Sequence, residues 1–593
     1  MGVSILFFIA VIIYITGAVF CPNKDNETKD GIHAIVFHII TLINIVAIGA
    51  MALDKLHVKI NLLTTSIMIC IMGVLFYIKI ILNKKTSKVN FPVHKVAGVL
   101  VVSGVIGYIS VRLFNFALED TYPIQDAAYH FLSSTEIVRN ESLGQYPFTA
   151  YLNAICIEVL QPLYNGVDIY KSFIISDIFF HLLEGVLVYL IFSQIFTHRA
   201  GKIFNPFFSI LYFIGYPYLC FSYGFVRQQR GMLLLLYVIY CMILLNQKRQ
   251  ERKSLWLLII LATINIMESY PIYVLQACSI IVVMFGYLYQ NEIKVFFRIK
   301  WRRWLCFFTL VFATVIMLFF AYKKFSAIRD NLSQAGGTYF SIYSDFIFFL
   351  PIIVYTCIEI IRGEKTLHLS AILFTCSFIV TIFEFVLWWN GIMSTYYFYK
   401  GYYALWGICW ICAVTAVQHI YEQNKQKAVY SYVSLLFVLI SFEVSDVSDA
   451  IIEKDPNIEN QVIHRNYFKL VEENLKHIAR KEREVFLSTG ETDIYDYVIK
   501  EFESDKVCYV STALDRATYV WYAGITGKNV YEVSPEDGYC EKIQYIATTG
   551  EFDYIIISKE SALFLDDEEY SEKFAVIYEN SAGMILGKKT ESW

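Results

Sequence analysis

Charged residues are scarce in this 593-residue chain, and that scarcity is the first clue to its class. Asp, Glu, Lys and Arg together make up 17% of the residues, whereas 57% are hydrophobic and 17% are aromatic. Soluble domains carry about 25% charged residues, so the composition argues against an ordinary soluble protein. The apolar and aromatic content, without a heptad or glycine repeat, also excludes a disordered chain, a collagen and a coiled coil.

The sequence also lacks the cysteine spacings of a disulfide framework or a zinc site. Eleven of the thirteen cysteines precede Val444 and stand in apolar runs, where a free cysteine behaves as a small hydrophobic residue. Cys409 and Cys412 lie within one such run, so their spacing indicates a helix and not a redox or metal motif. Residues 524–528, GITGK, lack the spacer and hydroxyl residue of a phosphate-binding P-loop, so we interpret them as a turn.

The charges that are present are distributed unevenly. Residues 444–593 contain 30 acids and 16 bases, a net charge of −14, and residues 1–443 contain 23 acids and 33 bases, a net charge of +10. The first part is therefore predicted to be a transmembrane domain and the second an acidic soluble domain.

Apolar runs recur through the first 443 residues. A membrane span needs about 20 apolar residues, and this criterion predicts about fourteen spans. They lie near residues 3–20, 31–51, 59–82, 92–113, 171–196, 203–221, 230–246, 254–267, 272–290, 303–321, 344–362, 366–389, 401–419 and 426–443. The predicted fold class is thus a polytopic α-helical membrane protein.

Lys and Arg residues in the short connections predict the orientation of the chain. Five basic loops alternate with the spans so that all fall on one side, at residues 84–88, 198–202, 248–253, 294–303 and 362–365. Positively charged loops face the cytoplasm. We therefore expect a multi-pass plasma-membrane protein in which residues 114–170 and everything after Val444 lie outside the cytoplasm.

The acidic C-terminal part is predicted to be a small α/β domain. Short apolar runs typical of buried strands occur at residues 507–510, 530–533, 554–557, 575–578 and 584–586. Helical spacing is present at residues 465–483 and 494–502.

The external segment after the fourth span has the residues for catalysis. Residues 116–132 read FALEDTYPIQDAAYHFL, with three carboxylates and one imidazole. Asp126 is predicted to lie at the start of a helix, whose positive end favours its charge, and His130 follows on the same face. Asp126 can then act as a general base, or the pair can hold a divalent cation such as Mg²⁺ or Mn²⁺. A solvated loop with an aspartate helix cap is the alternative.

This segment also resembles a known superfamily. A span followed by an external acidic loop with Asp-x-x-Tyr-His, an amphipathic helix, Asn-x-Ser and Tyr-Pro is similar to the C-type (GT-C) glycosyltransferases. The resemblance covers residues 119–171, and the many-span body and C-terminal domain resemble the family only in architecture. About three spans precede the one that feeds the loop, whereas the family ordinarily has one.

The resemblance implies a specific chemistry. Enzymes of this superfamily, which includes protein O-mannosyltransferases, oligosaccharyltransferase catalytic subunits and aminoarabinose transferases, take a sugar from a polyprenyl-phosphate-linked donor. They transfer it to an acceptor outside the cytoplasm. On this chain the catalytic carboxylate would be Asp126 or the pair Glu119 and Asp120, with Tyr129 and His130 beside the substrate and a glycan, lipid or protein as acceptor.

Polar residues in the predicted spans add candidates for substrate binding. Asp177, His181 and Glu184 recur on one helix face, and ionisable groups inside a span commonly mark a cavity or a partner. We expect Asp177 to line the catalytic cavity, with hydrogen bonding between helices as the alternative; a metal site made by the trio is a further option.

Three cations are candidates for binding the donor phosphate. Arg227 and Arg230 lie at the external end of a span, against the charge bias of the other loops, and arginine binds phosphate bidentately. Lys400 lies in a tyrosine-rich stretch at the same predicted depth. Snorkelling of these side chains to lipid headgroups is the alternative.

These features favour a membrane glycosyltransferase that transfers the sugar with inversion. A flippase or other transporter of lipid-linked oligosaccharide is one alternative, although the internal repeat common in transporters is not apparent. A polysaccharide polymerase or ligase built around the external arginines is another, and a non-catalytic surface scaffold is a third.

Overall fold

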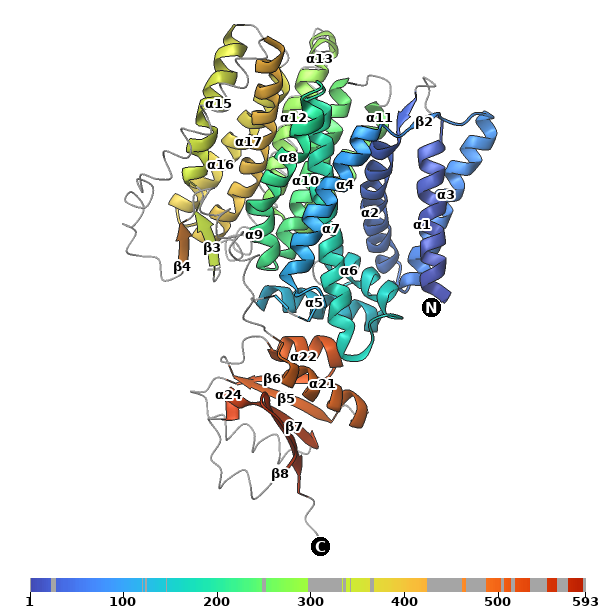
Figure 1. Cartoon of the computed structure of the whole chain (residues 1–593), viewed down its shortest axis with the longest axis vertical. Helices are drawn as coiled ribbons and strands as arrows, with labels where there is room; N and C mark the ends of the chain where they lie inside the picture. Colours follow the sequence, from blue (N-terminus) through green and yellow to red (C-terminus); the bar gives the residue numbers. More distant parts are fainter. Residues whose placement is uncertain are drawn as a thin grey trace.

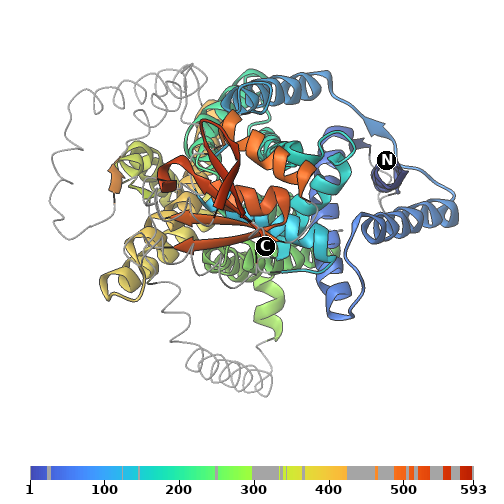
Figure 2. The ribbon, with the colours of Figure 1, turned by 90° about the horizontal axis from the view of Figure 1, so that it is seen from below.

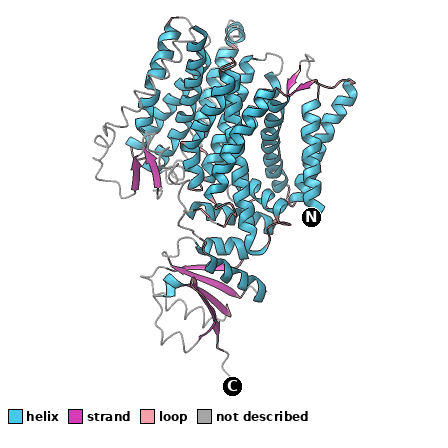
Figure 3. Cartoon of the chain, in the orientation of Figure 1, coloured by secondary structure: helices cyan, strands magenta, loops and turns pink. Residues whose placement is uncertain are grey.

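A computed structural model describes most of the transmembrane part and the core of the C-terminal part. The described residues are 2–22, 28–119, 121–122, 125–144, 147–247, 252–296, 333, 338–341, 343–362, 367–423, 461–464, 487–502, 506–512, 518–533, 552–562 and 574–589. They form a bundle of long helices with a small α/β domain at one end of it (Figures 1 and 3).

Eight helices in the described part are long and apolar enough to cross a membrane. They are α1 (Gly2–Phe20), α2 (Gly31–Lys55), α3 (Leu62–Asn83), α4 (Val93–Leu113), α7 (Ile169–Ile195, extended by the 3-10 turn η1, Gly166–Asp168), α10 (Val226–Gln247), α16 (His368–Trp389) and α17 (Thr395–Gln423). A ninth candidate is the pair α8 (Gly201–Ile214) and α9 (Tyr216–Ser222), bent by 43° at its break.

Further apolar helices match predicted spans without meeting all the criteria for one. These are α11 (Arg252–Ser269), α12 (Ile272–Leu288) and α15 (Tyr343–Ile361), and a short helix α13 (Gln290–Phe296) follows α12. The predicted spans at 303–321 and 426–443 lie outside the described residues. The helical membrane architecture is confirmed, and the total of fourteen spans stays a prediction.

Burial separates the central helices from the peripheral ones. The apolar windows of α7, α10 and α17 are 83%, 94% and 89% buried, so these helices form the core of the bundle. Only 22% of the window of α3 is buried, and its outward side chains, such as Ile71 and Leu82, are large and apolar. An apolar surface of this kind is suited to contact with lipid.

The two ends of the bundle differ in composition. The parallel pair β1 (Lys29–Asp30) and β2 (Val89–Asn90) adjoins the basic residues 84–88, and α13 adjoins the basic residues 294–303. Figure 1 shows β2 and α13 at one end of the bundle and the C-terminal domain beyond the other end. This arrangement agrees with the predicted separation of the basic loops from the acidic domain.

The predicted external loop is largely helical. It contains α5 (Gln125–Asn140) and α6 (Pro147–Leu160). Helix α6 is not a surface segment: most of it is buried, and it packs against α2, α7 and α11. The location of residues 114–170 outside the cytoplasm stays a prediction, and the structure shows that α6, within this segment, is packed among other helices.

The C-terminal domain contains a five-stranded mixed sheet in the order β6-β5-β7-β9-β8. Its strands are β5 (Val507–Thr512), β6 (Asn529–Val533), β7 (Tyr554–Ser558), β8 (Phe574–Glu579) and β9 (Gly583–Lys588). Strands β5, β6 and β7 are parallel, and β9 runs antiparallel between β7 and β8. All five predicted strands are confirmed.

Three helices accompany this sheet: α21 (Thr489–Glu501), α22 (Thr518–Thr526) and α24 (Lys559–Ala562). Helix α21 begins earlier than predicted because Ser488 and Glu491 form a capping box. The predicted turn at residues 524–528 begins only after α22 ends, and Gly527 adopts a φ of 72° there. The predicted helix at 465–483 and the domain boundary near Val444 lie outside the described residues.

A second, separate strand pair joins distant parts of the chain. Strand β3 (Thr338–Ser341) pairs in parallel with β4 (Gln461–His464). Seen from below, the C-terminal domain lies over the end of the bundle that contains α5 (Figure 2).

Candidate functional site

Helix α5 presents Asp126 at the end of the bundle that faces the C-terminal domain. Asp126 lies in the first turn of the helix, as predicted, and is exposed. The opposite face carries Ala127, Ala128 and Phe131, which are fully buried. This amphipathic pattern fixes α5 on the bundle and leaves the carboxylate of Asp126 accessible.

A glycine in the turn before α10 permits this packing. Gly224 has a φ of 68°, and a Cβ atom there would lie 2.7 Å from the Cβ of Ala127. Any other residue would be strained in that backbone conformation and would push α5 away.

Two cations lie near the start of α5. The ammonium of Lys400 on α17 lies 3.8 Å from the ring centroid of Phe225 and donates a hydrogen bond to the hydroxyl of Tyr396. Lys400 is only 7% exposed, and the charge of Asp126 acts on both Lys400 and Tyr396. Half-buried Arg227 donates from Nε to the carbonyl of Ser269 at 3.0 Å, at the end of α11.

His130 contributes a neutral imidazole to the same region. Burial, reinforced by the positive charges of Arg227, Lys400 and Arg230, lowers the pKa of His130 to about 3. At neutral pH the ring therefore has one nitrogen that donates and one that accepts a hydrogen bond. His130 is suited to orienting a substrate hydroxyl and not to supplying positive charge.

The described residues do not make a ligand set for a divalent cation. They contain no group of three His, Cys, Asp or Glu side chains placed to hold a metal, and no hydrogen bond or ion pair between Asp126 and His130 is found among them. Asp120 lies outside the described residues, so a metal bound by the acidic loop stays a prediction.

Asp177 and Arg230 form a buried ion pair in the interior of the bundle. Nη2 of Arg230 lies 2.5 Å from Oδ1 of Asp177, and the two side chains are 1% and 0% exposed. The hydroxyl of Tyr122 donates to Oδ2 of Asp177 at 2.7 Å, and Arg230 also contacts the side-chain oxygen of Asn153 at 3.3 Å.

For Asp177 this pairing corresponds to the second of the two predicted alternatives, bonding between helices, since its carboxylate meets Arg230 away from solvent. The physical reason is that a charge buried in a helix bundle requires a partner, and α7 and α10 bring these two together. The two arginines thus differ in exposure, because Arg227 is half-buried and Arg230 is 1% exposed. The predicted roles of Asp177 in the catalytic cavity and of Arg230 in phosphate binding stay predictions.

The other two members of the predicted trio on α7 also have separate environments. Glu184 accepts hydrogen bonds from Tyr403 at 2.9 Å and Tyr212 at 3.2 Å. The ring of His181 stacks on Phe221 with centroids 4.2 Å apart. The three side chains share one helix, as predicted, but they do not converge on one point and do not form a metal site among the described residues.

The remaining candidates lie at the edge of the site. Glu119 is exposed, and its carbonyl oxygen accepts a hydrogen bond from Tyr170 at 3.4 Å. The hydroxyl of Tyr129 lies 3.3 Å from that of Tyr519 in the C-terminal domain, so Tyr129 contacts that domain. Of the predicted catalytic carboxylates that are described, Asp126 and Glu119, it is Asp126 whose charge acts on Lys400.

Sequence patterns did not reveal how the C-terminal domain holds α5. Arg139 donates to the carbonyls of Ala523 and Gly524 on α22, and the rings of Phe131 and Trp521 pack with centroids 5.1 Å apart. These partners are nearly 400 residues apart in sequence, and no motif links them. Tyr122 was also missed, because a single tyrosine in a polar loop has no distinguishing signal.

Comparisons with known proteins yield a structural likeness. No family model matches the chain, and no curated protein matches it. The apo crystal structure of the Archaeoglobus fulgidus oligosaccharyltransferase is similar over 83% of this chain and 75% of that one, with 12% identity and a TM-score of 0.41. The structure of AglB, the archaeal oligosaccharyltransferase from the same organism, with an inhibitory peptide and a dolichol-phosphate is similar over 84% and 74%, with 12% identity and a TM-score of 0.42.

At this identity and TM-score the likeness carries no inference about activity.

Proposed function

We propose that this protein is a membrane glycosyltransferase that moves a sugar from a polyprenyl-phosphate-linked donor to a glycan, lipid or protein acceptor. The observation that carries the proposal is the exposed carboxylate of Asp126 beside buried Lys400 and half-buried Arg227. These groups lie where apolar helices meet a polar domain. A donor with an apolar tail and a phosphate requires cations at that position.

Each group has a defined role in the proposed transfer. The acceptor oxygen attacks the anomeric carbon of the sugar, and its proton passes to Asp126 acting as general base. The bond between the anomeric carbon and the phosphate oxygen breaks, and the electron pair leaves with the phosphate. Lys400 and Arg227 stabilise that negative charge, and attack opposite the leaving group inverts the sugar.

His130 and the buried ion pair support these steps. The neutral ring of His130 can accept or donate a hydrogen bond to the acceptor or the sugar. The pair Asp177 and Arg230 holds α7 and α10 together next to Arg227, so it positions the site without touching the substrate.

Transfer from defined donors tests the proposal. The purified full chain would be given labelled sugar on synthetic polyprenyl phosphates, with and without EDTA. Asp126→Asn should lower turnover by at least about 100-fold, the low end of the contribution of a general base. The matched control is Glu136→Gln, because Glu136 is exposed on the same helix.

Each contrary outcome has a specific meaning. Full activity in Asp126→Asn would refute the assignment of the base. If Arg227→Gln or Lys400→Gln abolished transfer while Asp126→Asn kept full activity, a polymerase or ligase built on cations would be favoured. Movement of lipid-linked sugar across liposomes without transfer would indicate a flippase. Loss of activity with EDTA would establish the divalent cation.

A further inference from the structure

A large cavity lies at the opposite end of the bundle from Asp126. Its volume is about 710 Å³, which is within the range of small-molecule and cofactor sites. Its walls come from α1, α2, α3, α7, α10 and α11, and Lys29 and Asp30 of β1 also line it. It therefore separates the N-terminal helices from the central ones on the basic-loop side.

The cavity combines an apolar wall with a charged rim. The apolar side chains include Phe37, Ile45, Met72, Leu75, Phe76 and Leu258. The rim contains Lys29, Asp30, His33 and Lys79. Asp30 is paired with Lys95 at 2.6 Å, so the rim keeps a net positive charge from Lys79 and Lys29. The ammonium of Lys29 is held in place by the carbonyls of Cys21 at 2.6 Å and Val19 at 3.2 Å.

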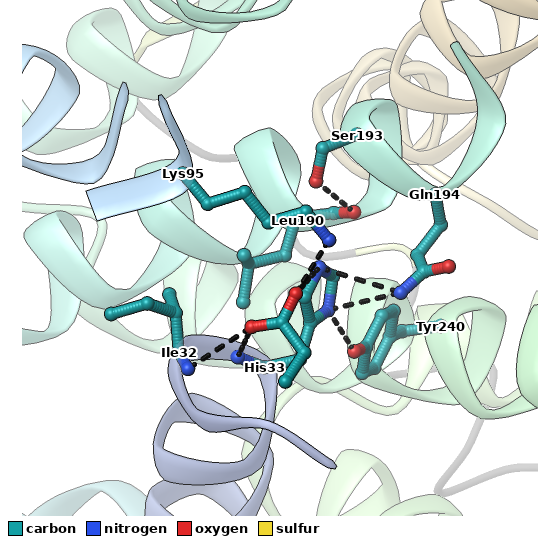
Figure 4. Close-up of polar contacts among 8 residues, drawn as sticks. Ile32, His33, Lys95, Leu190, Ser193, Gln194 and Tyr240 are labelled. Atoms are coloured by element: carbon teal, nitrogen blue, oxygen red, sulfur yellow. Dashed lines mark hydrogen bonds and ion pairs between the residues drawn. The ribbon is translucent and has the colours of Figure 1, made fainter. Parts of the chain in front are cut away.

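Hydrogen bonds hold the rim in place (Figure 4). The carboxylate of Asp30 caps α2 by accepting from the backbone nitrogens of Ile32 and His33 at 3.2 and 3.3 Å. Nδ1 of His33 lies 2.6 Å from the hydroxyl of Tyr240 and 3.2 Å from Nε2 of Gln194. These contacts join α2, α7 and α10, so the charged rim of the cavity is ordered before a ligand binds.

Two polar groups in the wall lack a protein partner. In the described part of the chain, neither the hydroxyl of Tyr14 nor Nδ1 of His38 has a hydrogen-bond partner. Tyr14 is 1% exposed, and both side chains line the cavity. An unsatisfied buried polar group is costly, so a ligand oxygen within the apolar zone would stabilise this region.

We propose that the cavity binds one anionic phospholipid. Its phosphate lies at Lys29 and Lys79, its acyl chains fill the apolar wall, and an ester oxygen lies beside Tyr14. The basic-loop side is predicted to face the cytoplasm, where the membrane surface is anionic. The lipid joins α1 and α3 to the central helices, and the inference does not depend on the proposed glycosyl transfer.

Native mass spectrometry of the purified full chain in detergent tests this inference. Phosphatidylglycerol, phosphatidylcholine and a polyprenyl phosphate would be added separately at equal concentration. One phosphatidylglycerol per chain should be retained, and phosphatidylcholine should bind about tenfold more weakly because it lacks a net charge for the two lysines. The polyprenyl phosphate, which lacks an ester, should also bind more weakly.

Substitutions in the cavity distinguish a built site from lipid adsorbed elsewhere. Lys79→Ala should weaken phosphatidylglycerol binding about fivefold, whereas Lys85→Ala, in the neighbouring loop, should not. Tyr14→Phe should weaken it by a few fold, whereas Tyr108→Phe, on the exposed face of α4, should not. Ala34→Phe should fill the cavity and abolish retention.

Three results would overturn the proposal. They are equal binding of phosphatidylcholine, preference for the polyprenyl phosphate, and retention by Ala34→Phe at the wild-type level. If Ala34→Phe does not fold, Lys79→Ala and Tyr14→Phe decide the question, and wild-type retention by both refutes the site.

Discussion

Two carboxylates of this protein, Asp177 and Asp126, interact with cations in different environments, and this difference indicates a structural role for one and a chemical role for the other. Asp177 is fully buried and paired with Arg230 at 2.5 Å. Asp126 is exposed, and Lys400 lies close enough for their charges to interact. A carboxylate that is already neutralised holds helices together, whereas an accessible one can accept a proton from a substrate.

Replacement of one member of the buried pair should therefore destabilise the fold. Asp177→Ala should lower the free energy of unfolding by about 3–5 kcal/mol, because it leaves Arg230 buried without a partner. The double variant Asp177→Leu/Arg230→Met should recover most of the stability and keep glycosyl transfer. Thermal unfolding in detergent together with the transfer assay measures both. A stable but inactive double variant would contradict a purely positioning role.

Lys400 should affect turnover more than stability. Its ammonium is held by Tyr396 and by the ring of Phe225 and would stabilise the departing phosphate. Lys400→Met should reduce kcat by about 100-fold, which is typical for loss of one stabilising group opposite developing charge. Lys253→Met, at the exposed start of α11, is the control. An unchanged kcat with a raised KM would instead show that Lys400 binds the substrate and the transition state equally well.

His130 should make the protein sensitive to acid. Its pKa is about 3 in the folded protein and about 6.5 when unfolded, so the unfolded state binds the extra proton as pH falls through this window. The contribution of the neutral ring is fully present above pH of about 6.5 and is lost progressively toward pH of about 3.

The unfolding temperature measures this effect. Between these pH values the unfolding temperature of the wild type should fall more steeply than that of His130→Gln. The control is His57→Asn, which replaces an exposed histidine. Asparagine is chosen because it tolerates the left-handed backbone conformation of position 57, where φ is 57°. Parallel pH profiles for wild type and His130→Gln would refute the depressed pKa.

At the scale of single elements, strands and helices could be predicted where hydrophobic pattern alone determines them. The run YIII at residues 554–557 is buried as β7 because its side chains have no polar face, and α5 is amphipathic as its spacing indicated. Helix α6 could not be predicted because its burial depends on α2, α7 and α11. The ion pair between Asp177 and Arg230 also depends on packing that no local pattern records.

The contact between α22 and α5 should control the position of Asp126. A Cβ atom on Gly524 would lie 2.6 Å from the ring of Phe131, so Gly524→Val should separate the two helices. Hydrogen exchange in α5 should then increase, and glycosyl transfer should fall at least about tenfold, because a misplaced base loses much of its effect. Gly104→Ala is the control, since nothing lies within 4 Å of its added Cβ.

Unchanged exchange in α5 in the Gly524→Val protein would show that the helix is held by the bundle alone. A loss of transfer without a change in exchange would place the defect in the C-terminal domain. Both outcomes would contradict a positioning role for α22.

At the scale of the whole molecule, the two ends of the helix bundle differ both in charge and in the structures that adjoin them. Residues 444–593 carry a net charge of −14, and the C-terminal domain lies at the end of the bundle that contains α5, the helix of Asp126 (Figure 1). The lysine-rich residues 84–88 adjoin β2 at the other end. The proposed donor and the proposed phospholipid would therefore occupy opposite leaflets, each beside its own cations.

This polarity predicts the orientation in the cell. An epitope tag placed after Trp593 should be removed when intact cells are treated with a protease, whereas a tag inserted between Lys85 and Thr86 should be protected until the membrane is permeabilised. The reason is that basic loops remain in the cytoplasm and the acidic domain crosses the membrane. The reverse pattern would place Asp126 in the cytoplasm, where it could not reach an extracytoplasmic acceptor, and would exclude the proposed transfer.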